Sequence, residues 1–538
     1  MRAVLEHQAA TLGPRPFLAL PDITLTYAEA DELANRVASG LAGLGVGPGD
    51  VDMAHCGNGV PLVGTWFACM KLGAVFMPVN SLLTGEPLRR VMAHAGGTIA
   101  VCDADLYPSL AEVRDGLPRL DHVVVVGGDH VRGTHSWQTL VERAAPAPPP
   151  SLAPDPSAPA KLMYTSGTTG TPKGARWSRA CEATWGRAYG NDLLPLQSGE
   201  AIYCCLPLAH VTCQGTVLAA LHRGGSVTIE AGFNPYGFWR RLAEADAVMF
   251  SFVGTILSVL ARRPPQPGDA DNRVRRAMGS GAPAGVWPAF EERFGLHVVD
   301  VWGQTETASC WTRPEALPQR PGTIGRPSPR FDARLVDDTG GECEDDEVGE
   351  LWMRPRRPGV MFDGYLDDEG RVVPPFDHEG WYHTGDFMRR APDGELSFAG
   401  RRRDAIRRRG EMIAAGDIEE AALAHPGVFE VAAVGVPADG AAVDGGADEE
   451  IKLCVVARPD VDLDPAELQE FLRARLPKFM VPRYLDLRPE LPKTPTTRVQ
   501  KYRLAEEGTA GVWDSRPGLR RTGPGPAPAP LGRRSQGR

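Results

Sequence analysis

The sequence predicts an α/β protein in which a large N-terminal domain of layered α/β subdomains precedes a small α+β domain. Three observations support this prediction. Short apolar runs alternate with helical patterns up to about residue 400, as in layered sheets with largely parallel strands. The composition then changes, because six of the nine residues from 401 to 409 are arginine. A chain of 538 residues is also long enough for two or more domains.

The first part of the chain contains clear helix and strand signals. Thr26 and Glu29 form a T-x-x-E capping box, and apolar residues at helical spacing follow it. The valine run at 123–126 predicts a buried strand. Prolines are dense between residues 146 and 159, which indicates a connector. Residues 160–165 then predict a strand that ends at a glycine-rich segment.

The second part of the chain has a different pattern. We expect a helix near residues 418–425 and two apolar strands near 428–436 and 451–456. A further helix is expected to begin at Asp464, which precedes a proline and then leucines on one helical face. Both element types occur without regular alternation, which favours an α+β domain.

These patterns place the domain boundaries. We predict an N-terminal domain over residues 1–402 and a C-terminal domain over residues 403–512. Residues 513–538 are rich in arginine, proline and glycine, and we predict that they form a disordered basic tail.

The composition argues against several classes of protein. The formal net charge of −10 argues against nucleic acid as a bulk partner. No apolar run approaches the roughly 18 residues of a membrane span, and the N-terminal segment contains Glu6 and no apolar core, unlike a secretory signal. The ten cysteines include no CxxC pair, so we interpret them as buried thiols rather than disulfides or metal ligands. We therefore expect a cytoplasmic protein.

The segment YTSGTTGTPKG, residues 164–174, is the strongest candidate for a binding site. A Walker A loop requires a lysine followed by Ser or Thr at the start of a helix. Here Lys173 lies between Pro172 and Gly174, and the next helix signal is Ser178, so that interpretation fails. Glycine amides and hydroxyl groups can nevertheless bind a phosphate, and the lysine adds a positive charge. A plain surface loop is the alternative.

Two other motifs carry polar residues suited to a nucleotide. VWGQTET follows a strand-like run at 297–302, and within it Thr305 can donate to a phosphate while Glu306 offers the oxygen ligands that Mg²⁺ prefers. In WYHTGDF, the carboxylate of Asp386 can accept from both hydroxyls of a ribose. Taken alone, an acid such as Glu306 is more often a solvated surface residue, and an aspartate after a glycine, such as Asp386, is normally a turn residue.

Six motifs together resemble those of the adenylate-forming enzymes, which include acyl-CoA synthetases, adenylation domains and luciferases. The motifs are YTSGTTGTPKGA, GSGAP, WGQTE, YHTGD, GRRRD and LPKTPTTRVQK, and the resemblance covers about residues 20–510. Residues 233–242 and 250–265 are similar to substrate-side segments of the crotonobetaine/carnitine-CoA ligases. The resemblance implies that the small C-terminal domain is mobile and swings about a hinge near Arg403.

The resemblance also implies a two-step reaction. The carboxylate of an acid attacks the α-phosphate of ATP, pyrophosphate leaves, and the acyl-adenylate then passes its acyl group to the thiol of CoA. Two anions have to meet in the first step, so the site must neutralise charge and align the groups. We therefore expect an AMP-forming acyl-CoA ligase that uses ATP, Mg²⁺ and CoA, as a monomer or a homodimer.

The resemblance assigns a role to individual residues. Those that hold the β- and γ-phosphates are Thr165, Ser166, Gly167, Thr168, Thr169 and Lys173. Thr305 contacts the α-phosphate and Glu306 binds Mg²⁺. Those that bind the nucleoside are Gly281, Ala282, Pro283 and Trp302 for adenine, and Asp386 and Arg401 for ribose.

Two further assignments concern the acyl and thiol channels. His210, in LPLAHV, matches the gate between the two channels, and a core histidine is the alternative. Gly410 is expected to face the pantetheine arm of CoA. The substrate-side segments 233–239 and 250–260 carry no charged residue, which favours a neutral aliphatic or aromatic acyl group.

The last motif departs from the family pattern. Thr497 and Arg498 stand where the family usually has Gly-Lys, and that lysine bridges the carboxylate and the α-phosphate. Arg498 keeps the charge on a planar group, and Lys501 is the alternative cation. Two other functions therefore stay open. One is an adenylating enzyme with another acid or acceptor, such as a carrier-protein thiol, or nitrite activation for attack by an aryl amine. The other is a non-catalytic binding protein.

Overall fold

The computed structural model describes residues 1–127, 131–150, 153, 155–165, 173–337, 339–401, 406–408, 411–413, 415–438, 449–459, 461–493 and 499–516. Its contacts divide the chain into two compact units. The larger unit comprises Met1–Glu347, Leu351–Thr384 and Arg389–Phe398, and the smaller one comprises Val348–Glu350, Gly385–Met388 and Ala399–Arg538.

The larger unit contains a nine-stranded sheet within the described residues. Its middle strands are parallel, whereas β9, β19 and β20 join it in antiparallel fashion at one edge. The strands in spatial order are β20 (Val372–Val373), β19 (Gly364–Leu366), β9 (Lys173–Ser178), β8 (Pro159–Thr165), β4 (Val75–Pro78), β3 (Val51–His55), β5 (Ile99–Asp103), β6 (His122–Val126) and β7 (His135–Ser136).

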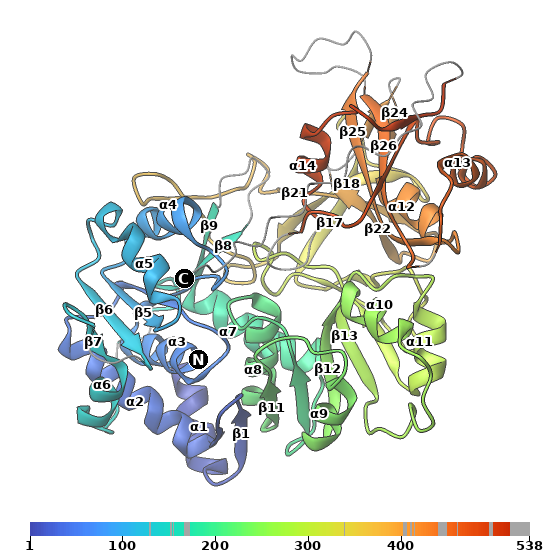
Figure 1. Ribbon diagram of the computed structural model, residues 1–538. Helices are drawn as coiled ribbons and strands as arrows, with labels where there is room; N and C mark the ends of the chain where they lie inside the picture. The colour runs from blue at the N-terminus through green and yellow to red at the C-terminus, as the bar shows by residue number, and fades with distance from the viewer. Residues whose placement is uncertain are drawn as a thin grey trace, which may run out of the picture. The chain divides into compact units, whose positions relative to one another are not determined.

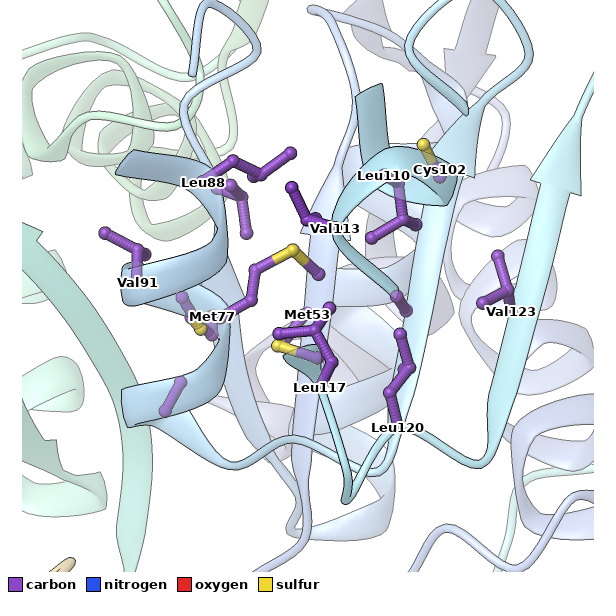
Figure 2. Close-up of a cluster of buried hydrophobic side chains, with 14 of the residues drawn as sticks. Met53, Met77, Leu88, Val91, Cys102, Leu110, Val113, Leu117, Leu120 and Val123 are labelled. Carbon is purple, nitrogen blue, oxygen red and sulfur yellow. The ribbon is translucent and has the colours of Figure 1, made fainter. Parts of the chain in front are cut away.

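Helices cover both faces of this sheet (Figure 1). One face carries α2 (Tyr27–Gly43), α3 (Val60–Leu72) and α6 (Trp137–Arg143), and the other carries α4 (Gly85–Ala95), α5 (Tyr107–Val113) and the short helix η1 (Arg114–Gly116). Figure 2 shows the second interface, where Leu88 and Val91 of α4 and Leu110 of α5 pack on Met53 and Met77 of the sheet. These side chains are almost fully buried, so hydrophobic burial holds the helices on the sheet.

A seven-stranded sheet follows a similar plan in the same unit. All its neighbouring strands are parallel except β1 and β2. Its strands in spatial order are β14 (His297–Asp300), β13 (Arg276–Ser280), β12 (Ala247–Val253), β10 (Ala201–Cys204), β11 (Ser226–Ile229), β1 (Pro16–Ala19) and β2 (Thr24–Thr26). The helices of this part are α1 (Arg2–Leu12), α7 (Arg179–Ala188), η2 (Tyr189–Leu193), α8 (Val211–Arg223), α9 (Phe238–Glu244), α10 (Gly254–Arg262) and α11 (Trp287–Phe294).

Two smaller sheets follow the seven-stranded sheet in the sequence. A ribbon is formed by β15 (Thr312–Arg313) and β16 (Arg326–Pro327). The second sheet has the spatial order β17 (Phe331–Val336), β18 (Val348–Pro355), β21 (Tyr382–Arg390) and β22 (Leu396–Arg401). The residues of β18, β21 and β22 are divided between the two units.

The rest of the smaller unit is the predicted α+β pattern. A ribbon of β23 (Ile406–Arg408) and β24 (Glu411–Ile413) precedes a mixed sheet of β25 (Val428–Pro437), β26 (Glu449–Ala457), β27 (Tyr484–Arg488) and β28 (Trp513–Asp514). Its helices are α12 (Ala415–Leu423), α13 (Pro465–Arg473) and α14 (Lys501–Glu506). The α/β and α+β classes expected from the sequence are therefore both confirmed.

Local sequence signals explain several element boundaries. Thr26 Oγ1 accepts from Glu29 N at 3.2 Å, and the Glu29 carboxylate accepts from Thr26 N at 2.8 Å, so the predicted capping box starts α2. Asp464 accepts from Ala466 N at 2.9 Å and starts α13. The expected strands at 123–126 and 160–165 are β6 and β8.

The predicted start of the C-terminal tail, residue 513, lies too early in the sequence. Trp513 and Asp514, placed in the tail from composition, form β28 and pair with Tyr484 and Leu485 of β27. Asp514 also forms an ion pair with the buried Arg483 at 3.2 Å. Composition could not reveal this strand, because its partner lies about 30 residues earlier in the chain. Residues 517–538 lie outside the described part of the chain.

Two further expectations can be compared with the structure. All ten cysteines are free and buried, as predicted. Over the described ranges, every helix is too short or too polar to cross a membrane.

Candidate active site

The two ends of the glycine-rich segment face each other on neighbouring strands. Thr165, the last residue of β8, is the register partner of Lys173, the first residue of β9. Lys173 therefore begins a strand rather than a helix, which excludes a Walker A loop. The helix signal at Ser178 is confirmed, since its side chain accepts from Cys181 N at 3.3 Å and starts α7. Ser166, Gly167, Thr168 and Thr169 lie outside the described residues.

Glu306 is the centre of a polar cluster beside these strand ends. Its carboxylate oxygen Oε1 accepts from Thr165 Oγ1 at 3.3 Å and from the Tyr365 hydroxyl at 2.9 Å. The residue is only 8% exposed. The Lys173 ammonium lies 5.2 Å from the centre of the Tyr365 ring. The structure thus brings together three of the predicted residues, Thr165, Lys173 and Glu306, while Thr305 lies next to them and is half-buried.

Tyr365 is a member of this cluster that the sequence analysis did not find. It lies on β19, where it pairs with Ala175 of β9 in an antiparallel register. Burial, and then the neighbouring charge of Glu306, raise the pKa of its hydroxyl, so it remains a neutral donor. It lies 59 residues from Glu306 in the sequence and in none of the six motifs, so only the strand pairing reveals it.

The donor set of this cluster fits Mg²⁺ rather than a transition metal. One carboxylate beside a hydroxyl group offers hard oxygen atoms, and Mg²⁺ usually takes one or two carboxylates and fills its shell with phosphate oxygens and water. Among the described residues, no group of three or more His, Cys, Asp and Glu side chains could enclose a metal. Glu306 is therefore suited to a cation that arrives together with ATP phosphates.

Most of the other predicted residues of this unit lie at one edge of the seven-stranded sheet. Strands β10, β12, β13 and β14 are parallel, so their carboxyl ends share that edge, where open α/β sheets bind ligands. Gly281 and Ala282 follow β13, and Trp302 follows β14, which ends at Asp300 rather than at residue 302 as expected. His210 follows β10.

Asp300 holds the predicted adenine loop. Its carboxylate accepts from Gly281 N at 2.8 Å and from Ala282 N at 3.0 Å. Gly281 adopts a φ of 78°, and its carbonyl oxygen lies so close to Gly254 that a Cβ there would approach it to 1.8 Å. Two glycines therefore permit this loop. Burial raises the pKa of Asp300 to about 7, although the backbone N–H groups oppose the shift.

Asp300 was not predicted, because it lies directly before the VWGQTET motif rather than within it. Trp302 itself is only 6% exposed, and its backbone N–H donates to Thr312 Oγ1 at 2.9 Å. Pro283 is half-buried next to Ala282, and its carbonyl accepts from Val286 N at 2.9 Å. The roles of Pro283 and Trp302 toward adenine stay predictions.

His210 lies directly before helix α8 and is half-buried. The loop that leads to it, residues 205–209, is fixed by the amide of Asn58. Asn58 Nδ2 donates to the carbonyl oxygen of Leu206 at 2.9 Å, and Asn58 Oδ1 accepts from Leu208 N at 2.7 Å. His210 N in turn donates to Pro207 O at 3.0 Å. The predicted gate residue thus follows a loop whose backbone groups have partners.

The smaller unit contains the two predicted ribose residues as an ion pair. Arg401 Nε lies 3.3 Å from Asp386 Oδ1, and Asp386 is 2% exposed. Gly385 precedes Asp386 with a φ of 69°, and its N–H donates to Glu350 Oε1 at 2.9 Å. The turn therefore depends on glycine at this position, because an L side chain is strained there.

Lys501 has a partner within the smaller unit. Its ammonium lies 2.6 Å from Glu419 Oε1, which also accepts from Ala433 N at 2.8 Å. Lys501 therefore links the start of α14 to α12. Arg498, Gly410 and the hinge residue Arg403 lie outside the described residues.

Two layered α/β sheets whose polar groups gather at strand ends, joined in sequence to a small α+β unit, define an adenylate-forming enzyme. Comparisons with known proteins agree with this class. The model of the AMP-binding enzyme family matches residues 5–366, and the model of the AMP-binding enzyme C-terminal domain matches residues 417–498. The chain therefore belongs to the AMP-binding enzyme family, and the resemblance inferred from the six motifs is confirmed.

Individual relatives cover almost the whole chain. A sulfoacetate–CoA ligase of Cupriavidus necator is 32% identical over 511 residues, which are 94% of this chain and 97% of the relative. A crotonobetaine/carnitine–CoA ligase of Salmonella paratyphi A is 27% identical over 89% of this chain and 92% of its own length.

Solved structures share the fold. An anthranilate CoA ligase in complex with anthranoyl-AMP superimposes with a TM-score of 0.83 at 22% identity, over 94% of this chain and 96% of that one. A benzoate CoA ligase from Burkholderia xenovorans gives a TM-score of 0.82 at 23% identity, over 94% and 99%.

Proposed function

We propose that the chain activates a small carboxylic acid with ATP and Mg²⁺ and transfers the acyl group to CoA. The observation that carries this proposal is the cluster around Glu306. A carboxylate whose partners are the hydroxyls of Thr165 and Tyr365, with the Lys173 ammonium close by, is suited to a magnesium–polyphosphate group.

The first step forms an acyl-adenylate. A carboxylate oxygen of the acid attacks the α-phosphorus of ATP, the bond from that phosphorus to the bridging oxygen breaks, and pyrophosphate leaves. Lys173 neutralises charge on the leaving group, and Thr305 donates to the α-phosphate. Glu306 holds Mg²⁺, which supplies positive charge to the phosphate oxygens when bound.

The residues proposed to bind the nucleoside have polar partners within the protein. The backbone of Gly281 and Ala282, fixed by Asp300, presents the loop that faces adenine. In the smaller unit, Asp386 accepts from the ribose hydroxyls, and its ion pair with Arg401 fixes the carboxylate. Groups ordered before the substrate binds lower the entropic cost of aligning the reactants.

The second step transfers the acyl group. The sulfur of CoA attacks the acyl carbonyl carbon, the bond from that carbon to the phosphate oxygen breaks, and AMP leaves. We propose that His210 borders the acyl and thiol channels and that Gly410 faces the pantetheine arm. The two proposed domains, divided in the sequence at Arg403, rotate about this residue between the two steps. Ten buried free thiols support a cytoplasmic location for the enzyme.

The identity of the acid is tested with a substrate panel. The named relatives act on sulfoacetate and on crotonobetaine or carnitine, which are charged, whereas the uncharged substrate-side segments favour a neutral acyl group. Pyrophosphate release is measured with ATP, Mg²⁺ and each acid, with and without CoA, and thioester is measured by mass spectrometry. Neutral aliphatic and aromatic acids are compared with sulfoacetate, crotonobetaine and carnitine. Nitrite with an aryl amine, and a carrier-protein thiol in place of CoA, complete the panel.

We expect pyrophosphate and a CoA thioester with at least one neutral acid. Pyrophosphate release only with nitrite and the amine, or thioester only on the carrier protein, would contradict CoA as the acceptor. No pyrophosphate with any acid would contradict adenylation.

A further inference from the structure

A lysine side chain is buried in the larger unit away from the phosphate cluster. Lys161 lies on β8, four residues before Thr165, and is 1% exposed. Its ammonium lies 3.0 Å from Glu182 Oε1 and 4.3 Å from the centre of the Trp66 ring. Two more tryptophans, Trp177 and Trp185, lie within 5.7 Å and 4.8 Å of the same nitrogen.

A buried ammonium is costly unless it is paired and hydrogen-bonded. Burial lowers the pKa of Lys161, and the charge of Glu182 opposes that shift. Trp66 Nε1 also donates to Glu182 Oε1 at 3.0 Å, so this carboxylate oxygen contacts two donors, the indole N–H and the Lys161 ammonium. The ammonium and carboxylate are thus matched within the protein, which argues against a role for Lys161 as a counter-ion of a substrate.

The second polar partner of Lys161, Gln214, extends the cluster to another loop. Lys161 Nζ donates to Gln214 Oε1 at 2.8 Å, and Gln214 Nε2 donates to the carbonyl oxygen of Leu208 at 3.0 Å. Gln214 is fully buried on α8, one turn after His210, and its N–H donates to His210 O at 3.2 Å. Asn58 binds the N–H of the same Leu208. Both backbone polar groups of Leu208 are therefore held by side-chain amides.

We propose that Gln214 is a positioning residue. It anchors the loop before His210 to the strand that leads into the phosphate segment, through Leu208 on one side and the Lys161–Glu182 pair on the other. The inference rests on the proposed acyl-CoA ligase function, in which His210 borders the acyl channel. Displacement of this loop then affects binding of the acid more than binding of ATP, because Thr165 and Lys173 lie on strands that keep their own pairing.

Two substitutions test the anchor. Gln214→Met removes the donor to Leu208 O and one acceptor of Lys161 Nζ, while the Lys161–Glu182 pair stays. Asn58→Asp removes the donor to the carbonyl oxygens of Leu206 and Glu230, while the acceptor for Leu208 N stays. We expect each to raise the KM for the acid about tenfold, since a buried carbonyl loses its partner, and to change the KM for ATP less than about twofold. Amide hydrogen exchange over residues 205–210 should become about tenfold faster, whether or not an active acid is known.

Thr216→Val provides the matched control. Thr216 is fully buried on the same helix, and its hydroxyl contacts Thr212 O and Ser251 Oγ, both at 2.9 Å, neither of which belongs to residues 205–209. This variant should lower Tm but leave the acid KM and the exchange over 205–210 unchanged.

The inference is overturned if Gln214→Met or Asn58→Asp leaves the loop exchange unchanged. It is also overturned if Thr216→Val lowers Tm as much as Gln214→Met and Asn58→Asp do and also changes the KM for the acid as much. A different result would contradict the proposed function: the wild-type enzyme would release no pyrophosphate with any acid.

Discussion

Two buried charged side chains in the larger unit, Lys161 and Glu306, have different kinds of partners. The Lys161 ammonium is matched by a permanent carboxylate, Glu182, and enclosed by aromatic rings. Among the described residues, the hydrogen-bond donors to the Glu306 carboxylate are the neutral hydroxyls of Thr165 and Tyr365, and the Lys173 ammonium lies over the Tyr365 ring. Because an unmatched buried charge is costly, the first arrangement stabilises the fold, whereas the second leaves a negative charge for a cation that comes with the substrate. We therefore expect substitution of Lys161 to reduce stability and substitution of Glu306 to reduce activity.

The largest effect on stability is expected at the matched pair. Lys161→Met leaves Glu182 as an uncompensated buried charge and should lower the free energy of unfolding by about 3–5 kcal/mol. The double variant Lys161→Met with Glu182→Leu should recover most of this loss, because no charge is left unpaired. Urea unfolding of the three proteins measures the difference. A double variant as unstable as the single one would show that the tryptophan packing, not the charge pair, dominates.

At the unmatched charge, activity should fall instead. Glu306→Gln keeps the shape and the hydrogen-bond acceptor but removes the charge that binds Mg²⁺. We expect pyrophosphate release to slow by about two to three orders of magnitude, the range for loss of one group that stabilises transition-state charge, with Tm almost unchanged. Titration of activity with Mg²⁺ should show a weaker dependence. Full activity of this variant would remove Glu306 from the site.

The smaller unit offers a second contrast, between Arg498 and Lys501. Lys501 already has Glu419 as an ion-pair partner, as Lys161 has Glu182, so we assign the catalytic charge to Arg498. Arg498→Ala should slow adenylate formation by about two orders of magnitude, yet convert a preformed acyl-adenylate and CoA at nearly the wild-type rate. Lys501→Ala should slow adenylation less than about tenfold. The reverse pattern in a stopped-flow pyrophosphate assay would make Lys501 the catalytic cation.

Tyr365→Phe removes one neutral partner of Glu306. The ring stays, so packing against Lys173 is kept, while one hydrogen bond of 2.9 Å is lost. A single hydrogen bond to a charged group corresponds to about 1.5–3 kcal/mol, so adenylation should slow by about 10- to 150-fold at most. Tyr164→Phe is the control, because Tyr164 lies on β8 and its hydroxyl contacts His94 instead. An equal loss of adenylation rate in Tyr365→Phe and Tyr164→Phe would indicate a general effect on packing.

The smallest expected effect is a pH dependence at Asp300. Its pKa of about 7 lies above the ordinary value of 3.8, so below pH 7 the carboxyl is largely neutral and accepts less well from Gly281 and Ala282. The KM for ATP should therefore rise a few-fold as the pH falls from about 8 to 6. Asp300→Asn, which cannot titrate, should give a flat profile over this range. A wild-type profile that is equally flat would contradict the assignment.

A fall in pH acts on stability through Asp300 in the opposite direction: it weakens ATP binding but stabilises the fold. A carboxyl whose pKa is raised on folding stabilises the folded state relative to the unfolded one at low pH, and this contribution is lost as pH rises from about 4 to 7. Asp300 thus lowers stability at the pH where it holds the loop best, which is typical of a group kept for function.

The sequence by itself determined the fold class, the strand β8, the capped helices and the family. These features depend on local patterns: apolar periodicity, the Thr26–Glu29 capping box, and motifs whose residues lie within a dozen positions of one another. It also named Thr165, Lys173 and Glu306, because each lies in a recognisable motif, and Thr165 contacts Glu306 and pairs with Lys173 in the structure.

Only the tertiary structure decided which side chains meet across those motifs. Tyr365 reaches Glu306 because β19 pairs with β9, and Asp300 reaches the adenine loop because β13 and β14 are neighbours. Trp513 and Asp514 belong to the C-terminal sheet rather than to a tail, since Arg483 supplies a buried partner for Asp514. The physical reason is common to all three. A hydrogen bond or ion pair between distant residues depends on strand register and burial, and neither leaves a periodic signal in the sequence.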